Sequence, residues 1–205
     1  MKQIFLSSSF SDVESLFVSF SKDRNKGQTI TFIPTASLRE EVKFYVEEGK
    51  KSLKNSGFII DELDISTATK DEISTKLRCN DAIYVCGGNT FFLLQELIRT
   101  GTDKLIKNHI NAGKLYIGES AGSVILSPNI EYIKDMDDIK AAPNLHSFSA
   151  LSEVEFYPLP HYTNFPFEKV VDKIISDYTD KINLCPISNA QAITLVGDKL
   201  EVLDK

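Results

Sequence analysis

The stretch YIGESAGSVIL, residues 116–126, joins a run of apolar residues to a second apolar run through a serine set among small residues. Its centre, GESAG, fits the pattern G-x-S-x-G, in which a strand turns sharply into a helix and exposes a serine hydroxyl. Gly118, Ala121 and Gly122 around the serine have little or no side chain, as is needed where strand and helix pass close together. The stretch therefore predicts a strand, a tight turn and a helix, with Ser120 as a nucleophile at the turn.

Outward from this stretch, apolar strands alternate with amphipathic helices. We expect strands at residues 3–8, 28–34, 58–63, 81–88 and 114–119, and helices at residues 11–22, 37–57, 70–79, 90–101 and 102–113. Because each apolar strand is followed by a helix, the pattern predicts a mostly parallel, doubly wound sheet with helices on both faces. The expected fold class is a three-layer α/β/α architecture.

The last third of the chain is less regular. Residues 153–162 resemble a further strand that ends at prolines, residues 167–179 form an amphipathic helix, and residues 190–203 suggest a hairpin that turns at Gly197. No repeat, low-complexity tract or linker interrupts the sequence. We therefore expect one domain over residues 1–205.

Ligands of such sheets bind beyond the carboxyl ends of the strands. This rule selects residues 7–9, 34–37, 87–90, 118–122 and 160–162, which are expected to converge on one rim. A serine nucleophile needs a base there. His161 follows a predicted strand and lies between prolines, so it is the favoured base; His146, in an irregular segment, is a weaker candidate, and His109 is expected on a helix surface.

The base needs an orienting carboxylate. The candidates between nucleophile and base are Glu131, Asp135, Asp137 and Asp138, and their spacing does not choose among them. They lie in or near the run KDMDD, which also fits a solvated loop.

An oxyanion needs preorganised N–H donors. The N–H of Ala121, directly after the nucleophile, is one candidate, and that of Gly88 in the turn CGGNT is the other. Asn89 and Glu119 adjoin these groups and are candidate substrate-binding residues. For Glu119 two interpretations stay open: its side chain points away from the rim, or it binds a substrate amine.

Composition limits the classes of partner. The net charge is −6, the pI is about 5.2, and no cluster of Lys and Arg suggests a nucleic-acid surface. Cys79, Cys86 and Cys185 are too few and scattered for a disulfide framework or a metal cluster. The sequence suggests neither a signal peptide nor a membrane span, so a reducing, cytoplasmic location is expected.

Five segments resemble the family of serine peptidases that contains peptidase E (aspartyl dipeptidase) and cyanophycinase. They are, in chain order, FLSSSF, TFIPTAS, IYVCGGNTFFLLQEL, YIGESAGSVIL and PLPHYTNFP. The resemblance implies a flavodoxin-like fold related to class I glutamine amidotransferases, with serine in place of cysteine at the turn. It also implies that Ser120 is the nucleophile, His161 the base and Asp135 its aspartate, with Gly88 and Ala121 as oxyanion donors and without a metal or organic cofactor.

One departure from that family concerns the substrate. After its histidine an aspartyl dipeptidase carries basic residues, including an arginine, whereas no arginine follows Arg99 here. Lys134, Lys140 and Lys169 remain as possible point charges. We therefore expect a serine peptidase for short peptides, as a monomer or homodimer, without an assured preference for Asp-X. The alternatives are an esterase or amidase for a non-peptide acyl group, and a binding module without turnover.

Overall fold

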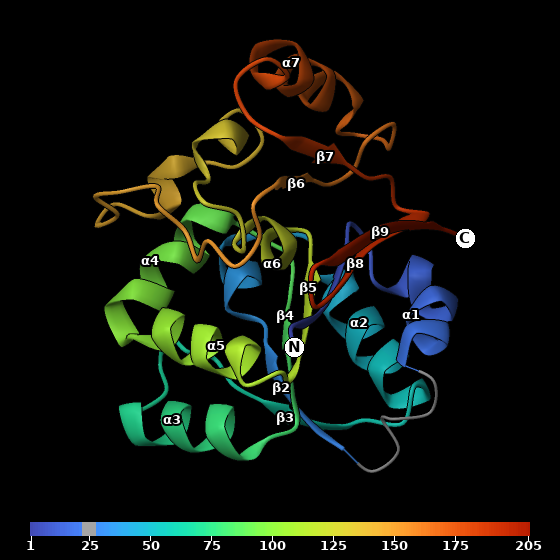
Figure 1. Ribbon diagram of the computed structural model, residues 1–205. Coiled ribbons are helices and arrows are strands. Elements are labelled where there is room, and N and C mark those ends of the chain that lie inside the picture. Colours follow the sequence, from blue (N-terminus) through green and yellow to red (C-terminus); the bar gives the residue numbers. More distant parts are fainter. Residues whose placement is uncertain (22–27) are drawn as a thin grey trace.

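The computed structural model describes residues 1–21 and 28–205 and is built on a seven-stranded sheet in the order β3-β2-β4-β5-β1-β8-β9 (Figure 1). The strands of this sheet are β1 (Gln3–Ser7), β2 (Thr29–Ile33), β3 (Ile59–Glu62), β4 (Ala82–Val85), β5 (Leu115–Glu119), β8 (Gln191–Val196) and β9 (Lys199–Asp204). The first five strands in this list pair in parallel, as the alternation predicts. β8 runs antiparallel to β1 and forms the predicted hairpin with β9 around Gly197, which has φ +62°.

Helices cover both faces of the sheet (Figure 1). They are α1 (Glu14–Ser21) and α2 (Phe44–Asn55) on one face, and α3 (Lys70–Cys79), α4 (Thr90–Thr100) and α5 (Thr102–Asn111) on the other. The four-residue helix α6 (Ala121–Val124) directly follows β5. The expected three-layer α/β/α fold is confirmed.

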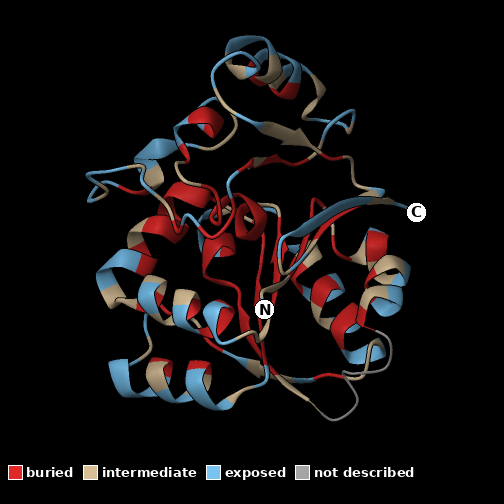
Figure 2. Ribbon diagram, viewed as in Figure 1, coloured by how far each residue is buried: buried red, intermediate tan, exposed pale blue. Residues whose placement is uncertain are grey.

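Strand residues alternate between the two cores, because successive side chains of a strand point to opposite faces. On β5, Ile117 packs with Phe5 and Tyr84 beneath α1 and α2, whereas Tyr116 belongs to the core beneath α3–α5. Figure 2 shows the strands buried between helices whose outer faces are exposed. β5 lies between β4 and β1, so its carboxyl end opens at the middle of the sheet.

A second, two-stranded sheet lies above the carboxyl ends of the central strands, together with α7 (Glu168–Tyr178) (Figure 1). It consists of β6 (Tyr157–Leu159) and β7 (Leu184–Pro186). The strand expected over residues 153–162 is thus reduced to β6 and lies outside the main sheet. Proline lacks the N–H that a sheet ladder needs, and Pro158 and Pro160 restrict pairing here.

Two further expectations were wrong. The helix predicted over residues 37–57 begins only at Phe44, because Thr35–Arg39 forms the 3-10 helix η2 and Glu40 is extended. His109 is not on the surface: it is 4% exposed, and its ring nitrogens lie 3.4 Å and 3.1 Å from the carbonyl oxygens of Leu77 and Leu115. Its helix, α5, packs against both α3 and β5.

The helix predicted over residues 11–22 is 3-10 at Ser11–Val13 and α-helical from Glu14. The last residue of that predicted helix lies outside the described residues.

Within the described part of the chain, no helix is long and apolar enough to cross a membrane.

Candidate active site

Ser120 occupies the turn between β5 and α6 with φ +48° and ψ −106°, a backbone conformation that residues with a side chain rarely adopt. Its N–H donates to the carbonyl oxygen of Ser7 over 2.9 Å, which fixes the turn to the neighbouring strand. The two flanking glycines are required by close packing. A Cβ atom at Gly118 would lie 2.4 Å from the carbonyl oxygen of Gly122, and one at Gly122 would lie 2.1 Å from that of Val85.

His161 lies opposite this turn, on the loop after β6. Its Nε2 is 2.9 Å from the Oγ of Ser120, and its ring stacks on Phe167 with centroids 4.5 Å apart. Burial lowers the pKa of the imidazole below its ordinary value of 6.5, and a hydrogen bond to Asn189 partly offsets this effect. At neutral pH the ring is therefore neutral and can accept a proton from the hydroxyl of Ser120.

The other ring nitrogen, Nδ1, lies 3.0 Å from Oδ1 of Asn189. Asn189 follows β7, and its own N–H donates to Oδ1 of Asn164 over 2.8 Å. With Oδ1 as the acceptor, the proton of the neutral ring resides on Nδ1 and leaves Nε2 free to face Ser120. Sequence reasoning missed Asn189, because it sought a carboxylate between nucleophile and base and did not identify β7.

The expected aspartate is not at His161. Asp135 is exposed and forms an ion pair with Lys173 of α7, and Glu131 lies 3.6 Å from Lys134. Asp138 caps the 3-10 helix η4 (Ile139–Ala141).

Asp137 Oδ2 accepts the N–H of Thr90 at the start of α4 over 2.7 Å. Burial and the charge of Glu40 raise the pKa of Asp137 to about 6. In the described structure the ring of His161 forms hydrogen bonds only to Ser120 and Asn189. The segment with the four acidic candidates instead packs on α4 and α7, and none of their carboxylates forms a hydrogen bond with the ring of His161.

The two backbone N–H groups that the sequence suggests as oxyanion donors have no hydrogen-bond acceptor among the described residues. Among the described residues no acceptor pairs with the N–H of Gly88, and Ala121 begins a helix, where the first N–H has no partner one turn earlier. Gly88 has φ +131°, and a Cβ atom there would lie 2.3 Å from the carbonyl carbon of Ala36. Only glycine fits this position, so the turn after β4 is held against η2.

Both predicted substrate-binding side chains are engaged within the protein. Asn89 caps α4 by accepting the N–H of Phe92, and it donates to the carbonyl oxygen of Asp138 over 3.0 Å. Glu119 is 3% exposed; its Oε1 accepts the N–H of Phe10 over 2.9 Å and its Oε2 the hydroxyl of Tyr84 over 2.8 Å. Burial raises the pKa of Glu119 above its ordinary value. Its carboxyl group thus lies within the core beneath α1 and α2, which agrees with the interpretation that it points away from the rim.

Tyr45, at the start of α2, is a neighbour of the site that the sequence did not suggest. A Cβ atom at Gly87 would lie 3.3 Å from Cβ of Ser120 and 3.6 Å from Cε2 of Tyr45, so the tyrosine ring and Ser120 both lie against Gly87. Its hydroxyl is buried without a hydrogen-bond partner among the described residues, and burial raises its pKa.

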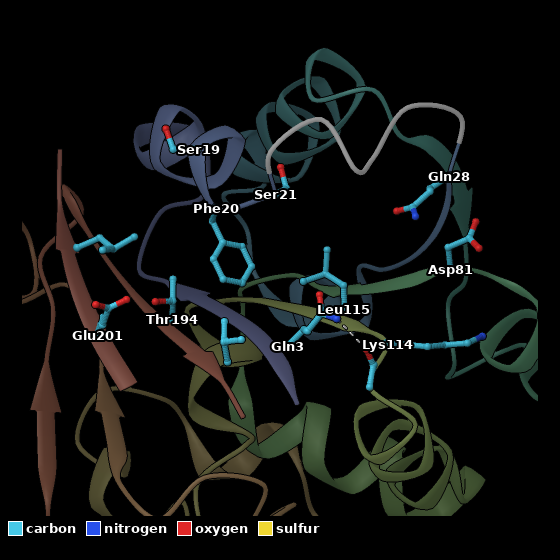
Figure 3. A pocket seen from close by; sticks show the side chains of 13 residues that line it. Gln3, Ser19, Phe20, Ser21, Gln28, Asp81, Lys114, Leu115, Thr194 and Glu201 are labelled. Carbon is cyan, nitrogen blue, oxygen red and sulfur yellow. Dashed lines mark hydrogen bonds between the residues drawn. The ribbon is translucent and has the colours of Figure 1, made fainter. Parts of the chain in front are cut away.

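A cavity of about 520 Å³ lies at the other end of the sheet, where the strands begin. Figure 3 shows side chains such as Gln3, Asp81, Leu115 and Thr194 around it. None of the predicted site residues lines it. Likewise, among the residues with described positions, no group of three His, Cys, Asp or Glu side chains could hold a metal ion.

The model of peptidase family S51 matches residues 4–203. The chain belongs to peptidase family S51. Among similar members, an uncharacterised peptidase of Listeria monocytogenes is 58% identical over 98% of this chain and 97% of its own length. Peptidase E of Shewanella amazonensis is 33% identical over 84% of this chain and 73% of its own.

Two solved peptidase structures are similar to this chain. The crystal structure of a candidate peptidase E of Listeria monocytogenes matches with a TM-score of 0.96 at 56% identity, covering 100% of this chain and 99% of its own. A peptidase of an acI-B1 actinobacterium shares the fold at a TM-score of 0.72 and 21% identity, with coverage of 100% and 88%. As a member of family S51 the protein is a serine peptidase, and hence a hydrolase.

Proposed function

We propose that this protein hydrolyses short peptides with Ser120, His161 and Asn189 as its catalytic triad. The observation that carries the proposal is the 2.9 Å contact between Oγ of Ser120 and Nε2 of His161, made at a turn of strained backbone. A serine hydroxyl becomes a nucleophile when an adjacent base accepts its proton. We assign this turn as a nucleophile elbow.

In the first step, Oγ of Ser120 attacks the peptide carbonyl carbon while its proton passes to Nε2 of His161. The N–H groups of Gly88 and Ala121 stabilise the negative charge on the carbonyl oxygen. The C–N bond then breaks as His161 returns the proton to the leaving amine, and an acyl-enzyme remains. Water, deprotonated by His161, hydrolyses this ester and restores Ser120.

Asn189 is neutral, so its effect on the ring of His161 differs from that of a carboxylate. Its Oδ1 holds the tautomer in which Nδ1 carries the proton, but it adds no negative charge to stabilise the imidazolium. This accounts for the direction of the shift in the pKa of His161, which burial lowers without a compensating anion. We infer an enzyme whose base stays neutral to a lower pH than in a triad with an aspartate.

Acidic side chains close to Gly88 in sequence or in space affect which charge a substrate can carry. Asp137 binds the N–H of Thr90, and Glu40 lies close enough for its charge to raise the pKa of Asp137. A substrate carboxylate would be repelled here. We therefore propose that peptides with a neutral first residue are better substrates than Asp-X. If Asp-X is nevertheless hydrolysed, Arg39, which stacks on Phe92 at 4.5 Å, is the cation to substitute first.

The proposal includes a cytoplasmic location, because a reducing compartment would keep Cys79, Cys86 and Cys185 as the free thiols found here.

The test is hydrolysis of a dipeptide panel, with Asp-X and neutral members, by the wild type, Ser120→Ala and Ser56→Ala. Ser56 is the control: it lies next to the end of α2, and its hydroxyl binds the carbonyl oxygen of Ser52. We expect Ser120→Ala to lose at least about 10³-fold in kcat while staying folded, and Ser56→Ala to keep full activity. Normal turnover by Ser120→Ala would refute the proposal, whereas cleavage of p-nitrophenyl esters but no peptide would favour an esterase.

A further inference from the structure

Three consecutive serines, Ser7, Ser8 and Ser9, stand at the carboxyl end of β1, and the catalytic scheme above uses none of their side chains. Ser7 supports the nucleophile: its carbonyl oxygen accepts the N–H of Ser120, and its hydroxyl donates to the carbonyl oxygen of Gly118 over 3.3 Å. Ser123 adds to this by donating to the Ser7 carbonyl oxygen over 2.8 Å and accepting the Ser7 N–H over 3.1 Å. The end of β1 is thus joined firmly to the turn that carries Ser120.

Ser8 reaches in another direction, toward the segments that carry His161 and Asn189. Its hydroxyl is the acceptor for the N–H of His161 over 3.0 Å and donates to the carbonyl oxygen of Ile187 over 2.9 Å. A hydroxyl group has one proton to donate and lone pairs that accept, so both bonds can exist together. Ser8 is 2% exposed, which keeps water from replacing either bond.

The backbone of His161 needs such support. It has φ +66°, in the left-handed region that residues other than glycine seldom occupy. Among the residues described here, the hydroxyl of Ser8 is the acceptor found for its N–H. Around it, Tyr162 donates to the carbonyl oxygen of Ile187 over 3.1 Å, and Ile187 donates to that of Leu159 over 2.9 Å.

Ser8 therefore connects three separate segments. Ile187 precedes Asn189 by two residues, so one hydroxyl is bonded both to the base and to the segment that orients it. The residues after Ser8 are in turn fixed to β5, the strand that ends directly before Ser120, because Phe10 donates its N–H to the buried carboxyl group of Glu119. Movement of Ser8 would alter the position of His161 relative to Ser120.

We propose that Ser8 is a positioning residue for peptide hydrolysis, whose hydroxyl holds His161 and the segment of Asn189 in register with Ser120. This inference rests on the proposed function, since it assigns His161 as the base. Ser8 itself takes no part in proton transfer and has no contact with the reacting atoms. It acts through the 2.9 Å contact of His161 with Ser120.

Steady-state kinetics of Ser8→Ala test this inference first. Loss of the hydroxyl leaves the N–H of His161 without its acceptor. Only a minority of molecules then keep His161 in contact with Ser120. We expect kcat to fall about tenfold or more, KM to change less than about threefold, and labelling of Ser120 by a fluorophosphonate to slow in parallel. Ser56→Ala removes a hydroxyl with the same 2.9 Å bond to a carbonyl oxygen, far from the site in sequence, and should leave all three quantities unchanged.

A second measurement needs no substrate. The pKa of His161, followed by NMR with ¹⁵N-labelled histidine, should lie below 6.5 in the wild type and move toward that value in Ser8→Ala, because the released ring becomes hydrated. A stability defect alone would not produce this shift. If Ser8→Ala does not fold, Ser8→Cys, which has a weaker donor of similar size, is measured in the same way with the same expectation.

The two measurements separate the two proposals. If the wild type cleaves no peptide but Ser8→Ala shifts the pKa of His161, the proposed function is refuted, while the inference that Ser8 holds His161 in place is supported. Unchanged kcat together with an unchanged pKa of His161 in Ser8→Ala would overturn the role of Ser8, even if the wild type is an active peptidase.

Discussion

At the scale of single residues, the site depends on which group faces Nδ1 of His161. Asn189 provides a neutral oxygen atom at 3.0 Å, whereas Asp135, the carboxylate that the family resemblance suggests, is bound to Lys173 at the surface. The pKa of His161 therefore reflects burial without a neighbouring anion. The base should stay deprotonated, and activity should persist, below the pH at which an ordinary histidine is half protonated.

Replacing Asn189 by aspartate tests this account. A negative charge next to the imidazole favours its protonated form, so Asn189→Asp should raise the pKa of His161. Because the deprotonated ring is the active base, the acidic limb of the pH profile of kcat/KM should move upward by about one pH unit.

The matched control is Asp135→Asn, which removes only the exposed ion pair with Lys173 and should leave the profile where it is. A profile that is displaced in Asp135→Asn but not in Asn189→Asp would restore the assignment made from the sequence.

At the scale of elements, the position of Ser120 follows from how closely α6 approaches β4. Gly122 allows this approach, because a Cβ atom there would overlap the carbonyl group of Val85. Gly101, in contrast, has φ +76° at the end of α4, and a Cβ atom there would meet no other group within 4 Å. A substitution at Gly122 therefore tests the effect of close packing on the fold, and one at Gly101 tests the effect of backbone conformation alone.

We expect Gly122→Ala to lower the free energy of unfolding by about 3 kcal/mol and to abolish turnover, since α6 must move away from β4. Gly101→Ala should cost only about 1 kcal/mol, the penalty of a left-handed residue, and keep its activity. Urea denaturation with parallel assays measures both. Equal losses in the two variants would show that close packing at Gly122 is not what places the turn.

At the scale of the whole molecule, the packing of helices on the sheet encloses a histidine that the sequence suggests is exposed. His109, on α5, has one ring nitrogen near the carbonyl oxygen of Leu77 in α3 and the other near that of Leu115 in β5. Burial, the larger effect, lowers its pKa from 6.5 to about 4. The unfolded chain therefore binds a proton at a higher pH than the folded protein does.

This difference makes His109 a source of acid sensitivity. Its contribution to stability is complete above the unfolded pKa of 6.5 and is lost as the pH falls toward the folded pKa of about 4, a change of about 3 kcal/mol. His109→Gln should reduce the loss of stability between pH 7 and 4, measured by thermal unfolding. The control, His146→Gln, alters an exposed histidine and should lose as much stability between pH 7 and 4 as the wild type does. Identical pH dependence in wild type and His109→Gln would contradict this account.

The sequence by itself determined the order of the first five strands of the main sheet along the chain, their parallel pairing and the tight turn at Ser120, and it indicated His161 as the candidate base. These features are local: alternating apolar patterns define strands and helices, and small residues at Gly118 and Gly122 are needed wherever a strand turns tightly into a helix. The same locality explains why Gly88 and His161 could be selected, since both lie at the carboxyl ends of predicted strands.

Only the tertiary structure decided which side chain orients His161, where Glu119 points and how Ser8 connects the site. Asn189 is 28 residues from His161 and Ser8 is 153 residues from it, and each contact exists because β1 and β7 are brought beside the loop after β6. A hydrogen bond between distant residues depends on the packing of whole elements, which no pattern of neighbouring residues records. A nearby carboxylate was therefore the wrong candidate, and a distant amide is the partner.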